Sequence, residues 1–171
     1  MIVVYMEIER LNKLIDKMIK QQLDISFAES ISAGNLIGEF AKGEGAGKVL
    51  KGGIVVYNEE SKIELLSVDP ATIEKYTAES QEVTNELVTG LFKLMKTDIA
   101  VAITGLASNG GSESEEKPVG TVFISIFFND HLKEFRKIFP PSQTEDVNKC
   151  KEEVIGCATN FVFEQLEKIV G

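Results

Sequence analysis

The sequence alternates short apolar runs with segments of helical periodicity, and this alternation restricts the fold more than any other feature. Residues 24–28, 52–57 and 98–104 are rich in β-branched or small apolar side chains, as buried strands are. Residues 82–96 instead place their apolar side chains on one helical stripe. Strands that alternate with helices predict a sheet packed between helices.

The rest of the chain continues the pattern and then changes it. The expected helices cover residues 7–22, 33–42, 59–66, 70–76, 82–96 and 144–170. Two further strands, 119–128 and 131–139, are joined by Asn129-Asp130, which predicts a hairpin turn. The predicted fold is therefore α/β: a three-layer mixed-sheet sandwich with helices on both faces, formed by one domain over residues 1–171.

Helix starts are marked by residues that commonly occupy first turns. We expect Ser30 or Ser32 to cap the helix over residues 33–42, and Ser80 to cap the helix over residues 82–96. Pro70 fits the first turn of a short helix.

Length and charge limit the classes of function. The 171 residues, 43% of them hydrophobic, suffice for one core and are too few for two ordinary domains. The net charge of −9, with lysines spread along the chain, argues against nucleic-acid binding. No apolar stretch is long enough for a signal peptide or a membrane span, so we expect no membrane partner and a cytoplasmic location.

The two cysteines fit the same location. Cys150 and Cys157 are seven residues apart in a predicted helix, which separates them by about 10 Å of rise, beyond the roughly 7 Å limit for a disulfide. Two thiols are also too few for a structural zinc site, so we expect no metal.

Two glycine-rich segments suggest phosphate binding, and only one of them fits. Residues 43–48 lack the first glycine of a P-loop, and Val49 stands where Ser or Thr would bind magnesium. The second segment follows a predicted strand, where open α/β sheets bind ligands. Its candidate ligand-binding residues are Thr104, Gly105, Ser108, Asn109, Gly110 and Gly111. A flexible surface loop is the alternative.

Any catalytic base must be found outside histidine. His131 is the only histidine and lies at the predicted hairpin, so a Ser-His-Asp triad and a histidine-based zinc site are both disfavoured. Lys62 follows Tyr57 by five residues, just after a predicted buried strand. A lysine acts as a base when burial lowers its pKa. A solvated surface lysine is the alternative.

Five segments, in order, resemble the motifs of one known family. Residues 28–34 look like A-E-S-C-T-G-G, residues 57–62 like Y-S-N-E-A-K, and residues 78–83 like A-V-S-E-E-V. Residues 104–111 resemble T-G-I-A-G-P-G-G, and residues 117–122 match K-P-V-G-T-V fully. The chain thus resembles the CinA C-terminal domain family of nicotinamide mononucleotide deamidases over nearly its whole length.

The resemblance implies an activity and a site. The family fold is a mixed α/β sandwich that often self-associates, so a homo-oligomer is expected. The implied reaction hydrolyses the amide of nicotinamide mononucleotide to nicotinate mononucleotide and ammonia in pyridine nucleotide salvage, without a cofactor. A serine attacks the amide, Lys62 takes the serine proton, Tyr57 relays or holds it, and the loop from Thr104 to Gly111 holds part of the nucleotide.

The chain departs from the family pattern at the implied nucleophile. Gly47 stands where the family has the second serine of a P-G-S-S turn. Ser30 and Ser32, in the first motif, are candidate replacements, with helix capping as the alternative role for both. The basic residue that the family places before its last helix has no clear counterpart in residues 140–148.

Three functions therefore stay open. The chain is an amidohydrolase with an altered nucleophile, a catalytically degenerate relative that binds a nucleotide, or a structural module that works through its oligomer surface. A serine oxygen within hydrogen-bond reach of the Lys62 nitrogen favours the enzyme.

Overall fold

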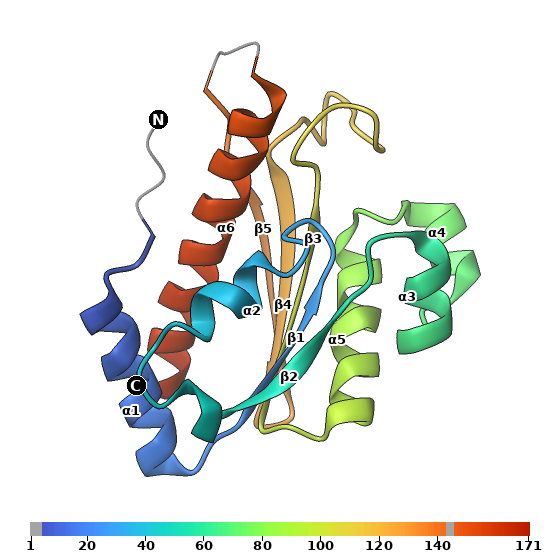
Figure 1. Ribbon diagram of the computed structural model, residues 1–171. Coiled ribbons are helices and arrows are strands. Elements are labelled where there is room, and N and C mark those ends of the chain that lie inside the picture. The colour runs from blue at the N-terminus through green and yellow to red at the C-terminus, as the bar shows by residue number, and fades with distance from the viewer. Residues whose placement is uncertain (1–4, 143–145) are drawn as a thin grey trace.

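The computed structural model describes residues 5–142 and 146–171, and a five-stranded mixed sheet lies at its centre (Figure 1). Strands β1 (Ile25–Glu29), β2 (Leu50–Val55) and β3 (Ile99–Gly105) run parallel, with β1 between the other two. β4 (Thr121–Phe128) pairs antiparallel with β3, and β5 (His131–Ile138) pairs antiparallel with β4. The strand order is β2-β1-β3-β4-β5.

The hairpin between β4 and β5 turns at the predicted dipeptide. Asn129 and Asp130 have φ angles of 50° and 60°, the left-handed region that a two-residue type I′ turn requires at both positions. Phe128 and His131 close the ladder as a pair. The predicted hairpin is confirmed.

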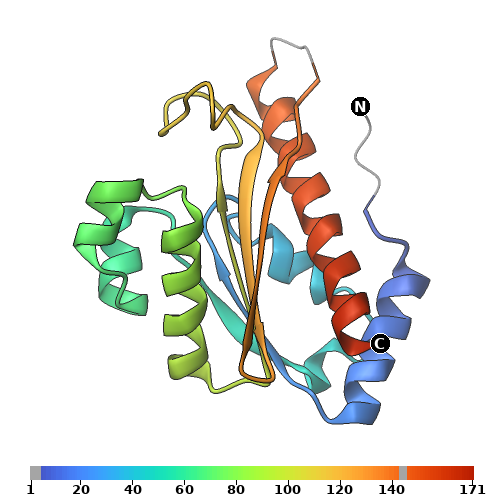
Figure 2. The same ribbon diagram turned by 180° about the vertical axis from the view of Figure 1, so that it is seen from behind.

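Helices cover both faces of the sheet (Figures 1 and 2). One face carries α1 (Ile8–Gln21), α2 (Asn35–Phe40) and α6 (Val147–Val170). The other carries α5 (Gln81–Met95), against which α3 (Glu59–Leu66) and α4 (Pro70–Tyr76) pack. This arrangement confirms the predicted three-layer sandwich.

The central strand β3 supplies a core to each face. Ile99, Val101 and Ile103 pack beneath α1, α2 and α6, whereas Ala100 and Ala102 face α5. All five side chains are buried, because a strand covered on both faces presents neither of them to water.

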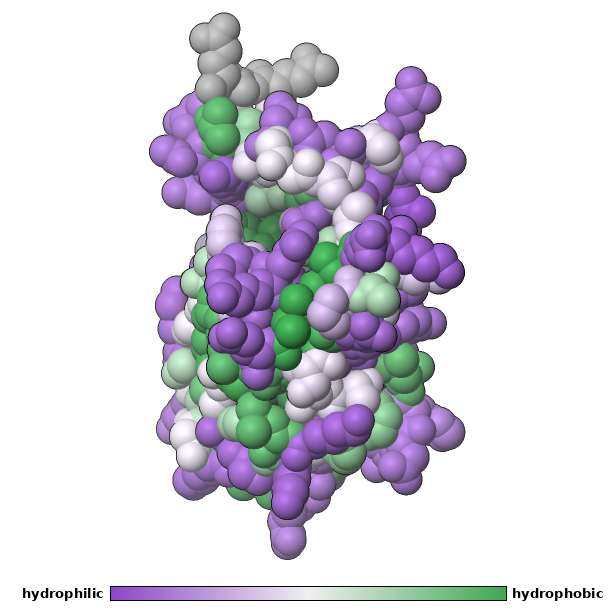
Figure 3. Space-filling model, turned by 90° about the vertical axis from the view of Figure 1, so that its right-hand side faces the viewer, coloured by the Kyte–Doolittle hydropathy of each residue, from purple (hydrophilic) through white to green (hydrophobic). Residues whose placement is uncertain are grey.

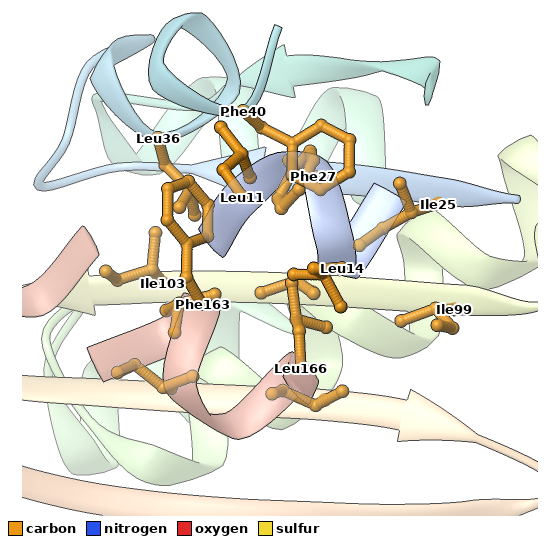
Figure 4. Close-up of a cluster of buried hydrophobic side chains, with 14 of the residues drawn as sticks. Leu11, Leu14, Ile25, Phe27, Leu36, Phe40, Ile99, Ile103, Phe163 and Leu166 are labelled. Atoms are coloured by element: carbon orange, nitrogen blue, oxygen red, sulfur yellow. The ribbon is translucent and has the colours of Figure 1, made fainter. Parts of the chain in front are cut away.

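Aromatic side chains join the helices to the sheet on the larger core (Figure 4). The Phe40 ring of α2 lies 5.4 Å from the Phe27 ring of β1 and 6.0 Å from the Phe163 ring of α6, measured between centroids. These contacts fix α2 against β1, and the residues that connect the two elements contribute to the candidate site.

The start of α2 differs from the prediction. Gly34 occupies the N-cap position, and the buried Glu29 carboxylate accepts three backbone N–H groups at the start of the helix, at 2.8 to 3.1 Å. The prediction that Ser30 or Ser32 caps this helix is wrong. A carboxylate from the end of β1 satisfies the free N–H groups instead.

Other helix starts follow the sequence. Ser80 Oγ accepts the Val83 N–H at 3.3 Å, and Pro70 is the first residue of α4, so both predictions are confirmed. α6 begins at Val147; its predicted start, Thr144, lies outside the described residues.

Candidate active site

Ser30 and Lys62 meet where two parallel strands end. Ser30 directly follows β1, and Lys62 lies in α3, shortly after β2. Because β1 and β2 are neighbours in the sheet, their carboxyl ends lie side by side, which is where open α/β sheets bind ligands. The Ser30 hydroxyl oxygen lies 3.2 Å from the Lys62 Nζ. Ser30 is tied to the sheet by its N–H, which donates to the Ile103 carbonyl at 3.0 Å.

The amine of Lys62 is buried among oxygen acceptors. Its side chain is 1% exposed, and besides the Ser30 oxygen its Nζ contacts the carbonyl oxygens of Val56 at 2.8 Å and Tyr57 at 3.4 Å. This set satisfies both protonation states: an ammonium donates to all three oxygens, whereas a neutral amine donates to the two carbonyls and accepts the serine O–H.

Burial favours the neutral form of the Lys62 amine. Desolvation lowers the pKa of Lys62 from its ordinary value, because the interior disfavours the ammonium ion. The carboxylates of Glu79 and Glu59 oppose this shift by attracting the charged form. A lysine whose pKa is lowered is a better general base near neutral pH.

Ser30 opens onto a cavity of about 390 Å³, here called the Ser30 pocket. Its described lining residues are Ser30, Ile31, Ala33, Tyr57, Glu79, Gly105, Leu106, Ala107, Ser108, Asn109, Gly110, Gly111, Lys151 and Ile155. Lys62 lies behind Ser30 and does not itself line the pocket. A larger cavity of about 620 Å³ between α3 and α5 contains none of the predicted site residues.

The glycine-rich loop contributes backbone groups to the pocket. The Gly110 and Gly111 N–H groups each donate to the Glu113 carboxylate at 2.9 Å, and these bonds lower the pKa of Glu113. This segment of backbone therefore holds a carboxylate of its own loop, and its binding of a ligand stays a prediction. Thr104 does not line the pocket: it is fully buried, and its hydroxyl contacts the Thr84 hydroxyl at 2.7 Å.

The other two predicted catalytic residues are placed differently from Ser30. Ser32 is buried, does not line the pocket, and its hydroxyl has no hydrogen-bond partner among the described residues. Tyr57 lies at the pocket with its side chain 68% exposed. Its contact with Lys62 is made by the backbone carbonyl, not by the phenol.

The model of the CinA C-terminal domain family matches residues 8–168. The chain belongs to the CinA C-terminal domain family. A CinA-like protein of Petrotoga mobilis is 37% identical over 157 residues, which cover 92% of this chain and 37% of that protein.

Other relatives agree on the family and on the fold. A putative competence-damage inducible protein of Alkaliphilus oremlandii is 43% identical over 112 residues, covering 66% of this chain and 27% of the relative. The competence or damage-inducible protein from Enterobacter asburiae superposes with a TM-score of 0.84 at 25% identity, covering 96% of this chain and 98% of that one. This CinA domain thus spans about a third of the length of the two curated relatives.

Two charged residues of the CinA domain's pocket escaped prediction. Glu79 lies between α4 and α5, and no local pattern marks it, since the family motif quoted for residues 78–83 has valine there. Lys151 lies one helical turn before Ile155 on α6, and both line the pocket. That four-residue spacing is a signal, but only tertiary structure shows which face of α6 meets the pocket.

Gly47 lies far from this pocket. It precedes β2, whose first residue pairs with Ile25 at the start of β1, whereas Ser30 follows the end of β1. β1 has five residues, so roughly 17 Å of strand separates the two levels of the sheet. A serine at position 47 of this CinA domain would not reach its own Lys62.

Two kinds of feature are absent from the described parts of the chain. Residues 5–142 and 146–171 contain no group of three His, Cys, Asp or Glu side chains placed to hold a metal ion. Over the same ranges no helix combines the length and hydropathy that a membrane span needs.

Proposed function

We propose that this CinA domain hydrolyses the carboxamide of nicotinamide mononucleotide to nicotinate mononucleotide and ammonia. The observation that carries the proposal is the 3.2 Å contact between the Ser30 hydroxyl, which lines a pocket, and the buried Lys62 amine. A hydroxyl nucleophile next to a base is the arrangement that acyl transfer from an amide requires. The identity of the amide rests on the family resemblance.

In the first step, neutral Lys62 accepts the Ser30 hydroxyl proton while the serine oxygen bonds to the carboxamide carbon. Negative charge then develops on the amide oxygen and needs hydrogen-bond donors. The Ile31 N–H directly follows the nucleophile, belongs to a lining residue, and donates to no acceptor among the described residues. It is our candidate for that donor.

In the second step, the carbon–nitrogen bond breaks. The Lys62 ammonium returns its proton to the leaving nitrogen, and ammonia departs from a nicotinoyl ester on Ser30. Water then attacks the ester carbon while Lys62 accepts a proton from it. The ester bond breaks, the proton passes to the Ser30 oxygen, and nicotinate mononucleotide leaves as the carboxylic acid, which then loses its proton to water.

The pocket also contains groups that fit the phosphate. Lys151 makes no ion pair or hydrogen bond with another described residue, so its ammonium is available to an anion. The Gly110 and Gly111 N–H groups already bind a carboxylate, that of Glu113. In this proposal the substrate phosphate displaces Glu113, and Lys151 supplies the cation that residues 140–148 lack.

Gly47 favours a second function, a nucleotide-binding domain without catalysis. One experiment separates the two: ammonia release from nicotinamide mononucleotide by wild-type protein and by the Ser30→Ala, Lys62→Met and Ser32→Ala variants. We expect Ser30→Ala and Lys62→Met each to lower turnover by at least about 100-fold, since each removes a chemical group of the reaction.

Ser32→Ala is the matched control, because it removes a neighbouring hydroxyl that does not line the pocket. It is expected to retain wild-type turnover. If the wild-type protein releases no ammonia at high enzyme concentration, hydrolysis of this substrate is refuted, and the binding function stands.

A further inference from the structure

The Ser30 pocket has a single acidic side chain among its described lining residues, that of Glu79. The side chain is half-buried and held from behind: Ser112 donates to one carboxylate oxygen, Oε2. Lys117 in turn donates to the Ser112 hydroxyl at 2.7 Å and to the Glu79 backbone carbonyl at 2.9 Å. The carboxylate is therefore oriented by a network rather than free in solvent.

The second carboxylate oxygen, Oε1, is available. It has no hydrogen-bond partner among the described residues, and it lies 4.0 Å from where a Cβ at Gly111 would stand. Gly111 lines the same pocket, so this oxygen lies beside the ligand space.

Glu79 has lysine neighbours, and the Glu113 carboxylate lies near it beside Gly111. Its attraction raises the pKa of both Lys62 and Lys117, in each case against the larger effect of burial. Lys151 adds a third amine and is the one of the three that lines the described part of the pocket. A cationic ligand group placed beside these amines would be repelled unless an anion lay close to it, and Glu79 is the acid that lines the pocket.

We propose that Glu79 recognises a positively charged pyridinium ring, so that the pocket selects oxidised N-ribosylated nicotinamide over uncharged ring forms. The inference rests on the proposed function, because it assigns the ring end of that substrate. Substitution at the ring nitrogen fixes a positive charge on the oxidised ring, whereas the reduced dihydropyridine form carries none. One carboxylate distinguishes the two by charge alone, since their shapes are otherwise similar.

The same contact has a consequence for catalysis. Glu79 attracts the ammonium form of Lys62, and a bound cation screens that attraction. The cationic ring thus favours the neutral base at the moment when the substrate is in place. An amide substrate with an uncharged ring does not screen the attraction between Glu79 and Lys62.

The test uses Glu79→Gln, which keeps an amide oxygen for the Ser112 hydrogen bond and removes the charge. Calorimetric titration compares nicotinamide mononucleotide with its reduced form, both on a Ser30→Ala background to prevent turnover. We expect Glu79→Gln to weaken binding of the oxidised form by about tenfold and to leave binding of the reduced form unchanged. Glu82→Gln, in the first turn of α5 and outside the pocket lining, is the matched control.

The outcomes separate the recognition role of Glu79 from the hydrolysis reaction. Equal losses for both ring forms would assign Glu79 a structural role and overturn this inference. Charge-selective binding that depends on Glu79, without ammonia release by the wild-type protein, would support the inference and refute hydrolysis. If neither ring form binds, both proposals fail.

Discussion

At the scale of single residues, the protonation state of Lys62 decides what the pocket can do. The ammonium form is an electrostatic partner, whereas the neutral form takes a proton from Ser30. The side chain is buried against two backbone carbonyls and one hydroxyl, and no carboxylate of the described residues contacts it directly. Burial in this setting therefore favours the neutral amine over the ammonium ion.

The pH dependence of catalysis follows from this burial. Because burial lowers the pKa of Lys62 below its ordinary value of 10.5, the neutral fraction of the amine rises with pH about a midpoint below that value. We expect kcat/KM for nicotinamide mononucleotide to rise with pH along one limb whose midpoint lies below 10.5. Glu79→Gln removes an attraction that raises this pKa, so the limb moves to lower pH with an uncharged amide substrate. A flat profile would contradict the assignment of Lys62 as the base.

At the scale of secondary structure, the sequence predicts the alternation of strands and helices, because strands and helices space their apolar residues differently. The apolar stripe of α5, the turn at Asn129-Asp130 and the Ser80 cap are local signals, and the structure confirms them. The cap at the start of α2 could not be predicted from such local signals. A serine cap is the commonest local solution, but Glu29 reaches the helix from the preceding strand.

That carboxylate is the subject of a stability prediction. Glu29→Gln keeps the shape but loses the charge and turns one acceptor into a donor that faces backbone N–H groups. We expect the free energy of unfolding to fall by about 2 kcal/mol. Urea denaturation followed by circular dichroism measures it, with Glu64→Gln on the exposed surface of α3 as the control. A loss equal to that of the control would show that Glu29 does not stabilise the start of α2.

At the scale of the whole molecule, the pocket is assembled from parts that the sequence keeps far apart. Ser30 follows β1, Glu79 precedes α5, and Lys151 lies on α6. Only the sheet order brings these parts to one end, so sequence patterns identified the serine–lysine candidates and the loop but neither Glu79 nor Lys151. The distance from Gly47 to the pocket likewise depends on the direction in which β2 runs.

Self-association stays a prediction, and Gly47 makes it relevant to catalysis. Figure 3 shows apolar surface among hydrophilic side chains on one side of the molecule, and Val55, Leu65 and Leu94 are among the exposed apolar residues. In an oligomer, position 47 of one copy would have to meet the pocket of another to act there.

Gly47→Ser tests this arrangement. The position is exposed, and a Cβ there meets no atom within 4 Å, so the variant is expected to fold normally. We expect ammonia release and sedimentation to match those of the wild-type protein. A large gain in turnover would show that position 47 reaches a pocket in an oligomer, and it would contradict Ser30 as the sufficient nucleophile.

Attack of Ser30 on the amide leaves an ester on its side chain, and an acid quench can trap that ester. Wild-type protein is mixed with nicotinamide mononucleotide, quenched in acid within the first turnovers, and digested for mass spectrometry. We expect a nicotinoyl mononucleotide adduct on the peptide that carries Ser30, and none in Ser30→Ala or Lys62→Met protein. Turnover that persists in Ser30→Ala, or an adduct on a different residue, would contradict Ser30 as the nucleophile.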